Sequence, residues 1–546
     1  MTNTFVFRKN MTVGNPAAED DADFLQACFV ENGDAETIKD TGSARSIILG
    51  RTGSGKSAIV QHILRTEEHV IEIVPQALSL AYVSNSDVLQ FFEKLGVNLD
   101  IFYQLLWRHI LAVELIRARY VIHDETGARS FFANITSKLT RDSKKIEALN
   151  YLREWGHSFW LETESRVKEV TSSLESKLAS SIDAKIGPFH AGLSDIEKVT
   201  SEEKQEVVNR AQKVVNSIQM QALYQILQML NDDIFDDPQK PYYIVIDKLD
   251  ENWIDDPTRY KLIRALIEAI KTFRSVQNVK IIVALRSDLL ERVFEHTRDS
   301  GFQAEKYEAL ILSLTWTRDQ LKELIDRRVD HLLRHIYTSA EVRFADVFPH
   351  KYRGTLTLDY MLDRTLMRPR DIIAFVNECL AKAQGKAQMI GKIIQSAEGT
   401  YSDKRFKALQ DEWIVDHPLL REYCSVRKKR SSSFVMGEVK PEELDNLALA
   451  LITRRADKNL ADSLGEKAEE YYEGKITARQ FGAEWIATLY KVGVVGVKSE
   501  SFVSAQWSYE GAPTISPNAI EQSAIIYVHP MLWRTLGISE IMEHRE

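Results

Sequence analysis

A glycine-rich segment close to the N-terminus constrains the fold of this chain more than any other feature. It follows a short apolar run, Ser46 to Leu49, which is typical of a strand, and it leads into helical apolar periodicity from Ser57. The segment fits the pattern GxxxxGK[ST] throughout and comprises Gly50, Arg51, Thr52, Gly53, Ser54, Gly55, Lys56 and Ser57. Its glycines let successive backbone N–H groups curl inward, so strand, loop and helix together predict a cradle for phosphate groups.

This phosphate-binding loop (P-loop) also predicts a nucleotide and a metal. In a loop of this kind the Lys56 ammonium reaches the β and γ phosphates, and the Ser57 hydroxyl ligates magnesium. An ordinary glycine turn is the alternative, but a turn does not need a strand before it and a helix after it. We therefore expect ATP and magnesium as cofactors, held by residues 50–57.

A second candidate for the site is the acidic end of a buried strand, Tyr242 to Ile246. Asp247 follows the strand directly, and we expect it to hold magnesium, mostly through water. Asp250 and Glu251 come within the next turn and compete for the role of the base that activates water. Glu251 is slightly preferred, because its longer side chain extends further. An acidic residue at a strand end that only solubilises a loop is the alternative for Asp247.

Further short apolar runs indicate that these strands belong to one parallel sheet. They occur at Val70 to Val74, Lys280 to Leu285 and Ile311 to Leu314. Between two of them, Thr258 to Phe273 carries apolar residues at helical spacing, as a crossover helix does. Apolar strands that alternate with helices predict an α/β fold whose sheet is buried on both faces.

The rest of the chain is mainly helical until close to its C-terminus. Thr477 is a candidate N-cap for a helix through Tyr490, and Gly493 is expected to end that helix. Three short strands are then expected, at Val494 to Val497, Gln506 to Tyr509 and Ile525 to Val528. A helix followed by a β-hairpin suggests a winged helix. Trp507 and Tyr509 would lie in its wing, where they could stack on a base or form the wing's own core.

The predicted organisation has five parts. They are residues 1–83 and 237–316, the two parts of an ATPase domain; 84–236, a helical insertion; 317–402, a helical lid; and 403–546, a winged-helix-like region.

The order of motifs resembles that of a known class of ATPases. Asp247 to Glu251 resembles the Walker B element of the NACHT branch of STAND ATPases, except that Lys248 stands where that branch has a small residue. The resemblance gives Arg286, at the end of the 280–285 strand, the role of first sensor at the γ phosphate. A surface arginine paired with Asp288 is the alternative for that residue.

A segment further along the chain resembles the second sensor of STAND and origin-recognition ATPases. It runs from Arg368 to Asp371, and the resemblance would put Pro369 beside the adenine and Arg370 beside the phosphates. Together, these motifs resemble the bacterial STAND-like P-loop ATPases of the FunZ type, several of which are suspected of antiphage roles. The resemblance implies an ASCE-type P-loop domain with a large helical insertion, a helical lid and a winged-helix-like end.

Composition limits where such a protein acts. With 79 acidic and 70 basic residues the net charge is −9, so any contact with nucleic acid must be local and is expected to be weak. The three cysteines are far apart and are expected to be buried apolar filler. The N-terminus has no apolar signal run, and no stretch approaches the roughly 20 apolar residues that cross a bilayer. We therefore expect a cytoplasmic protein.

These observations leave a main hypothesis and an alternative. The main hypothesis is a slow ATPase that acts as a switch, whose ATP state controls self-assembly or a partner effector, plausibly in antiphage defence. The alternative is an origin-recognition-like AAA+ ATPase that places its winged helix on DNA. A nucleotide-stabilised scaffold with negligible hydrolysis is a third possibility.

Overall fold

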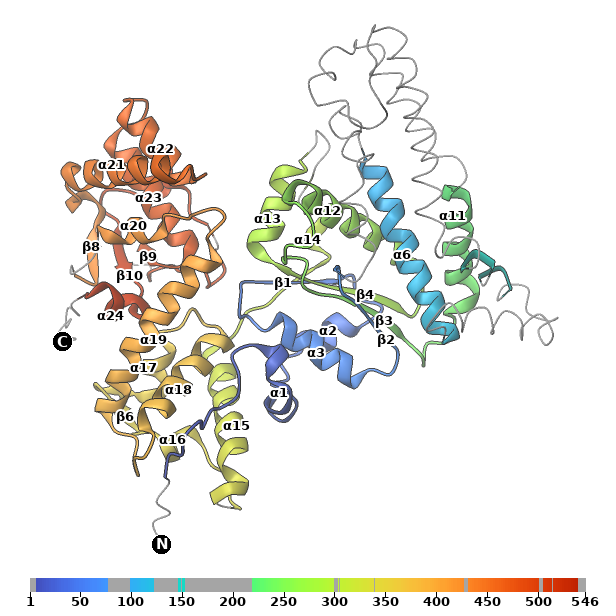
Figure 1. Cartoon of the computed structure of the whole chain (residues 1–546), viewed down its shortest axis with the longest axis horizontal. Coiled ribbons are helices and arrows are strands. Elements are labelled where there is room, and N and C mark those ends of the chain that lie inside the picture. The colour runs from blue at the N-terminus through green and yellow to red at the C-terminus, as the bar shows by residue number, and fades with distance from the viewer. Residues whose placement is uncertain are drawn as a thin grey trace, which may run out of the picture. The chain divides into compact units, whose positions relative to one another are not determined.

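The computed structural model divides the chain into two compact units (Figure 1). It describes residues 6–76, 99–121, 146–148, 150–152, 219–298, 303, 305–337, 339–426, 431–499, 504–512 and 514–538. Unit 1 comprises Met1–Asn32, Thr52–Ala58 and Thr315–Glu546, and unit 2 comprises Gly33–Arg51 and Ile59–Leu314.

Unit 2 is built on a five-stranded parallel sheet with the order β2-β3-β4-β1-β5. The strands are β1 (Ile47–Gly50), β2 (Val70–Ile73), β3 (Tyr242–Ile246), β4 (Val279–Arg286) and β5 (Ile311–Ser313). All five match the runs expected from the sequence to within one residue at each end. Every residue of β3 is buried, as expected for a strand with helices on both faces of its sheet.

Helices cover both faces of this sheet. They are α2 (Asp34–Lys39), α3 (Lys56–Thr66), α6 (Asp100–Tyr120), α11 (Gln219–Met229), α12 (Asp256–Phe273), α13 (Ser287–His296) and α14 (Glu305–Glu308), with a π-helical turn, η3 (Leu230–Ile234), after α11. In Figure 1, α6, α12 and α13 lie on one side of the strands and α2 and α3 on the other. The predicted crossover helix is α12, which begins earlier than expected because Asp255 caps it, its side chain accepting from the Thr258 N–H at 3.2 Å.

Within the predicted insertion, α6 and α11 are the long helices that the structure describes. The Trp107 indole N–H of α6 donates to the Leu262 carbonyl oxygen of α12 at 2.8 Å, and both helices contribute to one hydrophobic core. This part of the insertion is therefore packed on the ATPase sheet. The amphipathic stretch predicted around residues 167–182 lies outside the described residues.

A buried lysine joins the start of β1 to its neighbour β4. The Lys280 ammonium, 3% exposed, donates to the carbonyl oxygens of Asp40 at 2.8 Å and Ser43 at 2.7 Å. Burial lowers the pKa of Lys280 to about 8. The two carbonyls give the buried cation hydrogen bonds that replace those it loses from water.

Unit 1 contains the predicted lid. Its elements are η1 (Ala18–Asp20), α1 (Ala22–Cys28), α15 (Arg318–Tyr337), α16 (Phe344–Val347), β6 (Lys351–Tyr352), β7 (Thr355–Leu356), α17 (Thr357–Leu362), α18 (Pro369–Ala383) and α19 (Gly391–Glu412). The N-terminal segment is anchored on α15 by a buried ion pair of 2.6 Å between Arg328 and Asp21. The predicted lid boundary at residue 402 falls inside α19, whose apolar residues belong to the same core as those on either side of that boundary.

The C-terminal part of unit 1 combines helices with a three-stranded antiparallel sheet. Its elements are α20 (Leu420–Ser425), β8 (Ser433–Val435), η4 (Met436–Glu438), α21 (Pro441–Lys458), α22 (Ser463–Tyr472), α23 (Ala478–Val492), β9 (Val495–Lys498), η5 (Pro517–Ala519), β10 (Ile525–Val528), η6 (Pro530–Leu532) and α24 (Trp533–Leu536). The predicted helix is α23. The Thr477 side chain caps it by accepting from the Gln480 N–H, and Gly493 ends it at φ 87°.

One predicted strand is wrong. Gln506 to Tyr509 forms a single bridge, between Gln506 and Val497, and the chain then turns, with the Glu510 N–H donating to the Trp507 carbonyl at 3.0 Å. The third strand of the antiparallel sheet is instead β8, in the order β8-β10-β9. The Trp507 indole packs directly on Gly496 of β9, where an added Cβ would lie 2.6 Å from it. Trp507 is therefore part of the packing of this sheet.

Two further expectations concern burial and hydropathy. All three cysteines are free and buried, as expected. In the described part of the chain no helix has the length and apolar character needed to cross a bilayer.

A buried histidine in α6 makes the stability of the chain depend on pH. His109 is 3% exposed, and its Nδ1 lies 2.8 Å from the Tyr151 hydroxyl. Burial, and then the charge of Arg117, lower the pKa of His109 to about 3. In the unfolded chain this histidine takes up a proton near pH 6.5, whereas in the folded chain it stays neutral down to about pH 3. The free energy of unfolding therefore falls as the pH drops from 6.5 towards 3.

We predict that His109→Gln weakens this acid sensitivity. Between pH 6.5 and 5 the wild-type histidine costs about 1.6 kcal/mol of unfolding free energy, because the slope reaches about 1.4 kcal/mol per pH unit only below the unfolded pKa. Urea unfolding at both pH values should show a smaller difference for the variant. His350→Gln, at an exposed position, is the control and should behave like the wild type. An equal loss in all three proteins would contradict the prediction.

Candidate nucleotide-binding site

The carboxyl ends of three strands meet at one edge of the sheet in unit 2. Gly50, the last residue of β1, is the register partner of Arg286, the last residue of β4. Asp247 follows β3, which is the other neighbour of β4. In parallel α/β sheets this edge is where ligands bind. The sheet therefore brings together the start of the P-loop, the predicted magnesium carboxylate and the predicted first sensor.

The backbone of the P-loop requires its glycines. Gly53 has φ 80° and Gly55 has φ 102°, a region that residues with a Cβ rarely adopt. An added Cβ at Gly53 would lie 2.7 Å from the Arg370 Cβ, which is too close for any side chain. The helix α3 then begins at Lys56, so its positive N-terminal end follows the loop directly.

Two hydroxyl groups in the loop fit a phosphate ligand. The Thr52 and Ser54 hydroxyls are buried and make no hydrogen bond within the described part of the chain. A buried polar group without a partner costs about 1–3 kcal/mol, so such groups usually serve a ligand, an ion or water. The loop therefore has the curled backbone and the donors that a nucleotide phosphate needs.

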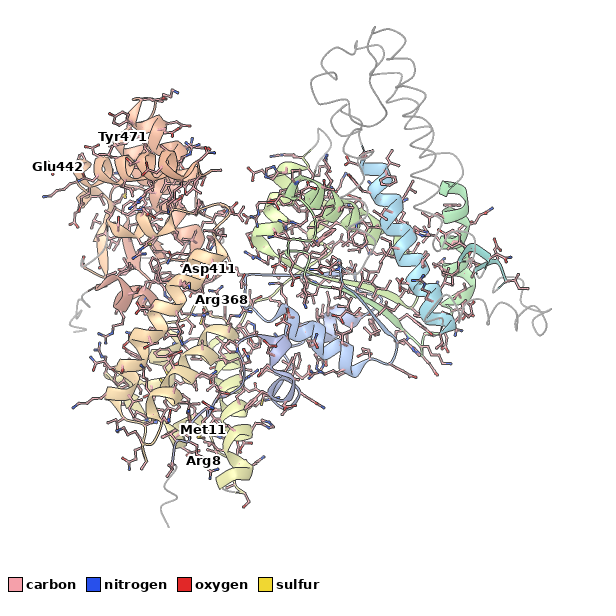
Figure 2. All side chains as sticks on the ribbon, in the orientation of Figure 1. Arg8, Met11, Arg368, Asp411, Glu442 and Tyr471 are labelled. Carbon is pink, nitrogen blue, oxygen red and sulfur yellow. The ribbon has the colours of Figure 1, made fainter. Side chains whose placement is uncertain are left out.

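Arg368 of the lid and Trp316, the residue before the predicted lid, hold the carbonyl oxygens of the same loop. The Trp316 indole N–H donates to the Ser54 carbonyl at 2.8 Å, and the Trp316 ring lies 3.6 Å from the position of a Cβ on Gly55. Arg368, labelled in Figure 2, donates from Nη1 to the Thr52 carbonyl at 2.7 Å. Trp316 and Arg368 therefore hold the P-loop backbone through its carbonyl oxygens. The phosphate oxygens of a nucleotide would accept hydrogen bonds from the N–H groups of the same loop.

Arg368 is itself held in a buried ionic network. It lies 3.2 Å from Asp371 and 3.0 Å from Glu412, and Arg405 lies 3.1 Å from the other oxygen of Asp371. Burial alone would raise the pKa of Asp371, but Arg368 and Arg405 outweigh it and lower that pKa to about 2. The network joins the start of α18 to the end of α19, so the P-loop contact belongs to a rigid part of the lid.

The predicted second sensor lies beside the P-loop. Pro369 is in the first turn of α18, a position that suits its fixed φ. The Arg370 N–H is 3.4 Å from the Gly53 carbonyl oxygen, and its guanidinium donates to the Pro16 carbonyl at 3.2 Å. Burial, and then the nearby Arg368 and Arg405, lower the pKa of Arg370. The roles expected for Pro369 and Arg370 towards adenine and phosphate remain predictions.

The two candidate bases in the acidic turn after β3 have different partners. Asp250 lies 3.6 Å from Arg286, whereas Glu251 accepts a hydrogen bond from the Gln76 side chain in the loop after β2. Arg286 also donates to both oxygens of Asp288, at 3.0 and 2.9 Å. The pairing with Asp288 that the sequence left as an alternative is therefore present, at the strand end where a first sensor would lie.

Sequence reasoning did not assign Trp316 and Arg368 to the site. Trp316 lies three residues after β5, and Arg368 is the residue before Pro369. An aromatic residue soon after a strand end, and an arginine at a helix N-cap where Ser, Thr or Asp is usual, are signals that could have drawn attention to both.

Comparisons with known proteins agree with this description only in part. Residues 319–410, from α15 to α19, match the family model described as the FunZ-associated C-terminal helical domain. No curated protein matches the chain.

Two solved structures are similar over nearly the whole length. One is the Walker-type ATPase PABY2304 of Pyrococcus abyssi, with 12% identity, coverage of 98% of this chain and 100% of that one, and a TM-score of 0.35. The other is the ORC2 protein of Aeropyrum pernix, from its ADPNP-ADP complexes, with 11% identity, coverage of 98% and 95%, and a TM-score of 0.32. At these TM-scores neither likeness says anything about the residues of the site.

We predict that Lys248→Gly stabilises the protein. Lys248 follows Asp247 with φ 62°, and its N–H donates to the Asp247 carboxylate at 2.8 Å. The left-handed conformation costs a lysine about 1–2 kcal/mol, whereas glycine adopts it freely but loses about 0.5–1 kcal/mol more in chain entropy. Urea unfolding at pH 7 should therefore show a gain of up to about 1 kcal/mol. Lys248→Ala keeps the strain and should show no gain, and an equal response of both variants would argue against strain here.

Proposed function

We propose that this chain is a magnesium-dependent ATPase that acts as a STAND-like switch. The observation that carries the proposal is the double use of the P-loop. Its backbone acceptors on Thr52 and Ser54 are held by the lid residue Arg368 and by Trp316, the residue before the predicted lid, and its buried hydroxyls fit a phosphate. A nucleotide bound in the loop would therefore change the conformation of the same residues, Thr52 and Ser54, that contact Arg368 and Trp316.

The chemistry assigned to each residue follows from its position in the motifs. Lys56 would neutralise charge on the β and γ phosphates, and Ser57 and Asp247 would hold magnesium. Magnesium, when bound, neutralises phosphate charge during transfer. In the described residues no cluster of three or more His, Cys, Asp or Glu side chains could hold a metal.

Glu251 is the better candidate for the residue that orients the attacking water. Asp250 is an ion-pair partner of Arg286 at 3.6 Å, and we propose that it keeps this contact during the reaction. Glu251 is held by the neutral Gln76 amide, so it keeps an oxygen that can accept a proton. Arg286 would release Asp288 to approach the γ phosphate. Breaking the ion pair with Asp288 costs energy, which supports slow hydrolysis.

The output of the switch would pass through the lid to self-assembly or to a partner effector. The match of residues 319–410 to a FunZ-associated domain supports this reading, because that region contains Arg368 and Arg370 together with Asp371 and Arg405, two of the partners in the buried ionic network. On the resemblance to FunZ-type proteins, we propose that the switch acts in antiphage defence.

DNA binding by an origin-recognition-like ATPase is the second candidate. The winged helix predicted from the sequence favours it, but α23, the helix expected in the recognition position, does not. Eight of the fifteen residues of α23 are buried, so most of its surface packs inside unit 1. Its cations are Arg479 and Lys491, which is few for the phosphate contacts of a duplex. We therefore favour a protein-interaction role for this region.

The first test is nucleotide affinity. Lys56→Ala should lower the affinity for MgATP by roughly 100-fold, or about 2.7 kcal/mol, because it removes the cation in the phosphate cradle. Calorimetric titration of the folded full chain measures this. Lys407→Ala, an exposed lysine of α19, is the matched control and should bind like the wild type. Equal affinity of both variants would sink the assignment of the P-loop.

The second test separates the two acids. Glu251→Gln keeps the shape of the side chain but cannot accept a proton, so it should bind ATP normally and release phosphate at least about 100-fold more slowly. Asp250→Asn should retain most of the hydrolysis rate. Phosphate release together with retained radiolabelled ATP gives both readings. If Asp250→Asn traps ATP and Glu251→Gln turns over normally, the base is Asp250.

A further inference from the structure

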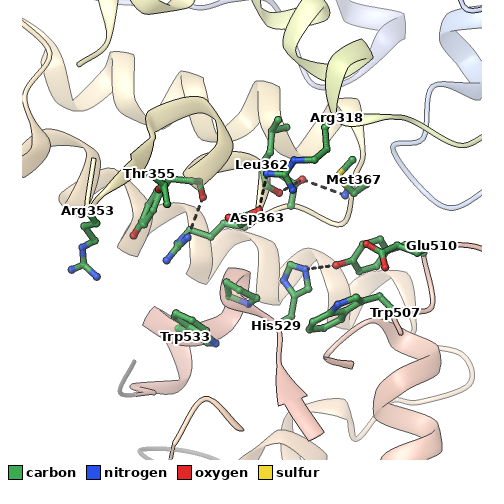
Figure 3. Close-up of a pocket in the computed structure, with 15 residues that line it drawn as sticks. Arg318, Arg353, Thr355, Leu362, Asp363, Met367, Trp507, Glu510, His529 and Trp533 are labelled. Carbon is green, nitrogen blue, oxygen red and sulfur yellow. Dashed lines mark hydrogen bonds and ion pairs between the residues drawn. The ribbon is translucent and has the colours of Figure 1, made fainter. Parts of the chain in front are cut away.

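One pocket outside the proposed ATPase site is in unit 1 and is lined in part by Arg318 and Arg364 (Figure 3). Arg318 lies 2.7 Å from Asp363, and Arg364 lies 2.7 Å from the buried Glu398. The protein therefore already neutralises the charge of these two guanidinium groups. A smaller pocket in unit 2 differs in this respect, because its cations have no acidic partner.

The pocket in unit 2 lies where β1 and β4 begin. Its walls are residues 41–43 and Ser46 of the loop before β1, the end of α12, and residues 279–281 of β4. Its volume is about 70 Å³, whereas a single water needs about 10–15 Å³, so it can hold several waters or one small polyatomic ion. Because the P-loop follows the end of β1, this pocket is at the opposite edge of the parallel sheet.

Lys280 is the buried cation of this pocket. It is 3% exposed, and its ammonium donates to the carbonyl oxygens of Asp40 at 2.8 Å and Ser43 at 2.7 Å. An ammonium has three N–H donors, so one is left, and no carboxylate of a described residue lies within ion-pair distance. A charge buried to this extent is usually paired with an opposite charge. Lys280 therefore has both a donor and a charge to offer a ligand.

Arg274 brings a second cation to the same pocket. It is the C-cap residue of α12 and is exposed, and its side chain makes neither a hydrogen bond nor an ion pair within the described part of the chain. Burial lowers the pKa of Lys280, the charge of Asp40 opposes this shift, and the charge of Arg274 adds to it. An anion between the two cations would offset their mutual repulsion.

Two hydroxyl groups add neutral donors. Thr41 and Ser46 line the pocket, and neither hydroxyl forms a hydrogen bond with another described residue. Ser46 is 3% exposed, so its hydroxyl has little access to bulk water. A hydroxyl can turn its proton towards an acceptor that enters the pocket. The loop before β1, the end of α12 and the start of β4 thus each contribute a donor.

The negative charges near the pocket are smaller in sum than the positive ones. The Asp40 carboxylate accepts from the Gly42 N–H at 2.8 Å, and the C-terminal end of α12 carries about half a negative charge from its backbone dipoles. Against these stand the full charges of Lys280 and Arg274. The balance therefore favours an anionic ligand.

We propose that this pocket binds a free tetrahedral oxyanion, with inorganic phosphate as the model ligand, between Lys280 and Arg274. An ion of this shape presents oxygens in several directions, so it can accept from the ammonium, the guanidinium and the hydroxyls together. A planar carboxylate such as acetate has only two oxygens and satisfies fewer donors. The small volume has no room for the organic part of a phosphate ester.

The test is calorimetric titration of inorganic phosphate into the full chain carrying Lys56→Ala, which removes the cation of the P-loop. Adding Arg274→Gln should lower the affinity at least roughly 10-fold, because it removes one charge-assisted hydrogen bond. Adding Lys280→Met, which keeps the length of the side chain and removes its charge, should have a similar effect. Arg343→Gln, at an exposed position of the lid, is the matched control and should bind phosphate like the parent chain.

Other ions identify the chemistry that the pocket recognises. Sulfate is also tetrahedral and should bind within a few-fold of phosphate. Acetate and phenyl phosphate should bind at least roughly 10-fold more weakly. Equal binding of acetate would contradict tetrahedral recognition, and equal binding of phenyl phosphate would mean that the site takes a phosphate ester. Either result would overturn the proposal.

A pH series with sulfate, which carries no titratable proton in this range, tests the part played by Lys280. With a pKa of about 8, its charged fraction falls about 10-fold from pH 7 to pH 9, and the affinity should fall with it. The charged groups that face Lys280 are Asp40 and Arg274, and side chains of these types do not ordinarily titrate in this range. The pH dependence should be absent in Lys280→Met. An affinity that is the same at both pH values with Lys280 present would contradict its role as a ligand.

Thermal unfolding of each variant shows that it is folded, and Arg274→Gln, at the surface, keeps the test decisive if Lys280→Met does not fold. The proposal is overturned if phosphate fails to bind at millimolar concentration, or if binding is unaffected by both variants. Phosphate should also raise the unfolding temperature of the parent chain more than that of the Arg274→Gln chain. Because every titration is made without the P-loop lysine, the result does not depend on the ATPase proposal.

Discussion

The position of β1 between β4 and β5 is the constraint on which the rest of unit 2 depends. The strand is only four residues long, yet both of its edges are paired, and the Ile47 N–H and the Ser46 carbonyl take part in bonds to either neighbour. Because its register with β4 is fixed, the residue that opens the P-loop always faces the arginine that ends β4. A slip of one residue would turn Ile47 and Leu49 to the opposite face of the sheet and move the loop away from this edge.

In unit 1 the equivalent constraint is electrostatic. Arg368, Asp371, Arg405 and Glu412 are largely buried, and each charge is tolerable only because an opposite charge lies about 3 Å away. Removing Glu412 or Asp371 would leave a buried arginine without sufficient compensation, which typically costs several kcal/mol. The same arginine reaches the P-loop, so the geometry of the loop depends on the integrity of the helical lid.

Local sequence patterns were sufficient for the elements that are defined by neighbouring residues. Examples are the five strands of the parallel sheet, the crossover helix α12 and the caps of α23. The residues that determine each of them lie within the element or a few positions from it. The contacts of Trp316 and Arg368 with the P-loop join residues more than 260 positions apart, and no local pattern contains them. The strand expected at Gln506 to Tyr509 failed for a related reason. Its aromatic residues pack on Gly496 and His529, and β8, which has only three residues, takes its place beside β10.

The burial of all three cysteines has a practical consequence for chemical labelling. Burial raises the pKa of the Cys28 thiol to about 11 and that of Cys424 to about 12, and it raises that of Cys379 further. At neutral pH these thiols stay protonated, and maleimides or iodoacetamides react with the thiolate. Thiol reagents should therefore label the native chain very little. One cysteine introduced at an exposed position of the lid would carry a fluorophore or spin label without removal of the natural three, and slow reaction of those three would report opening of the core.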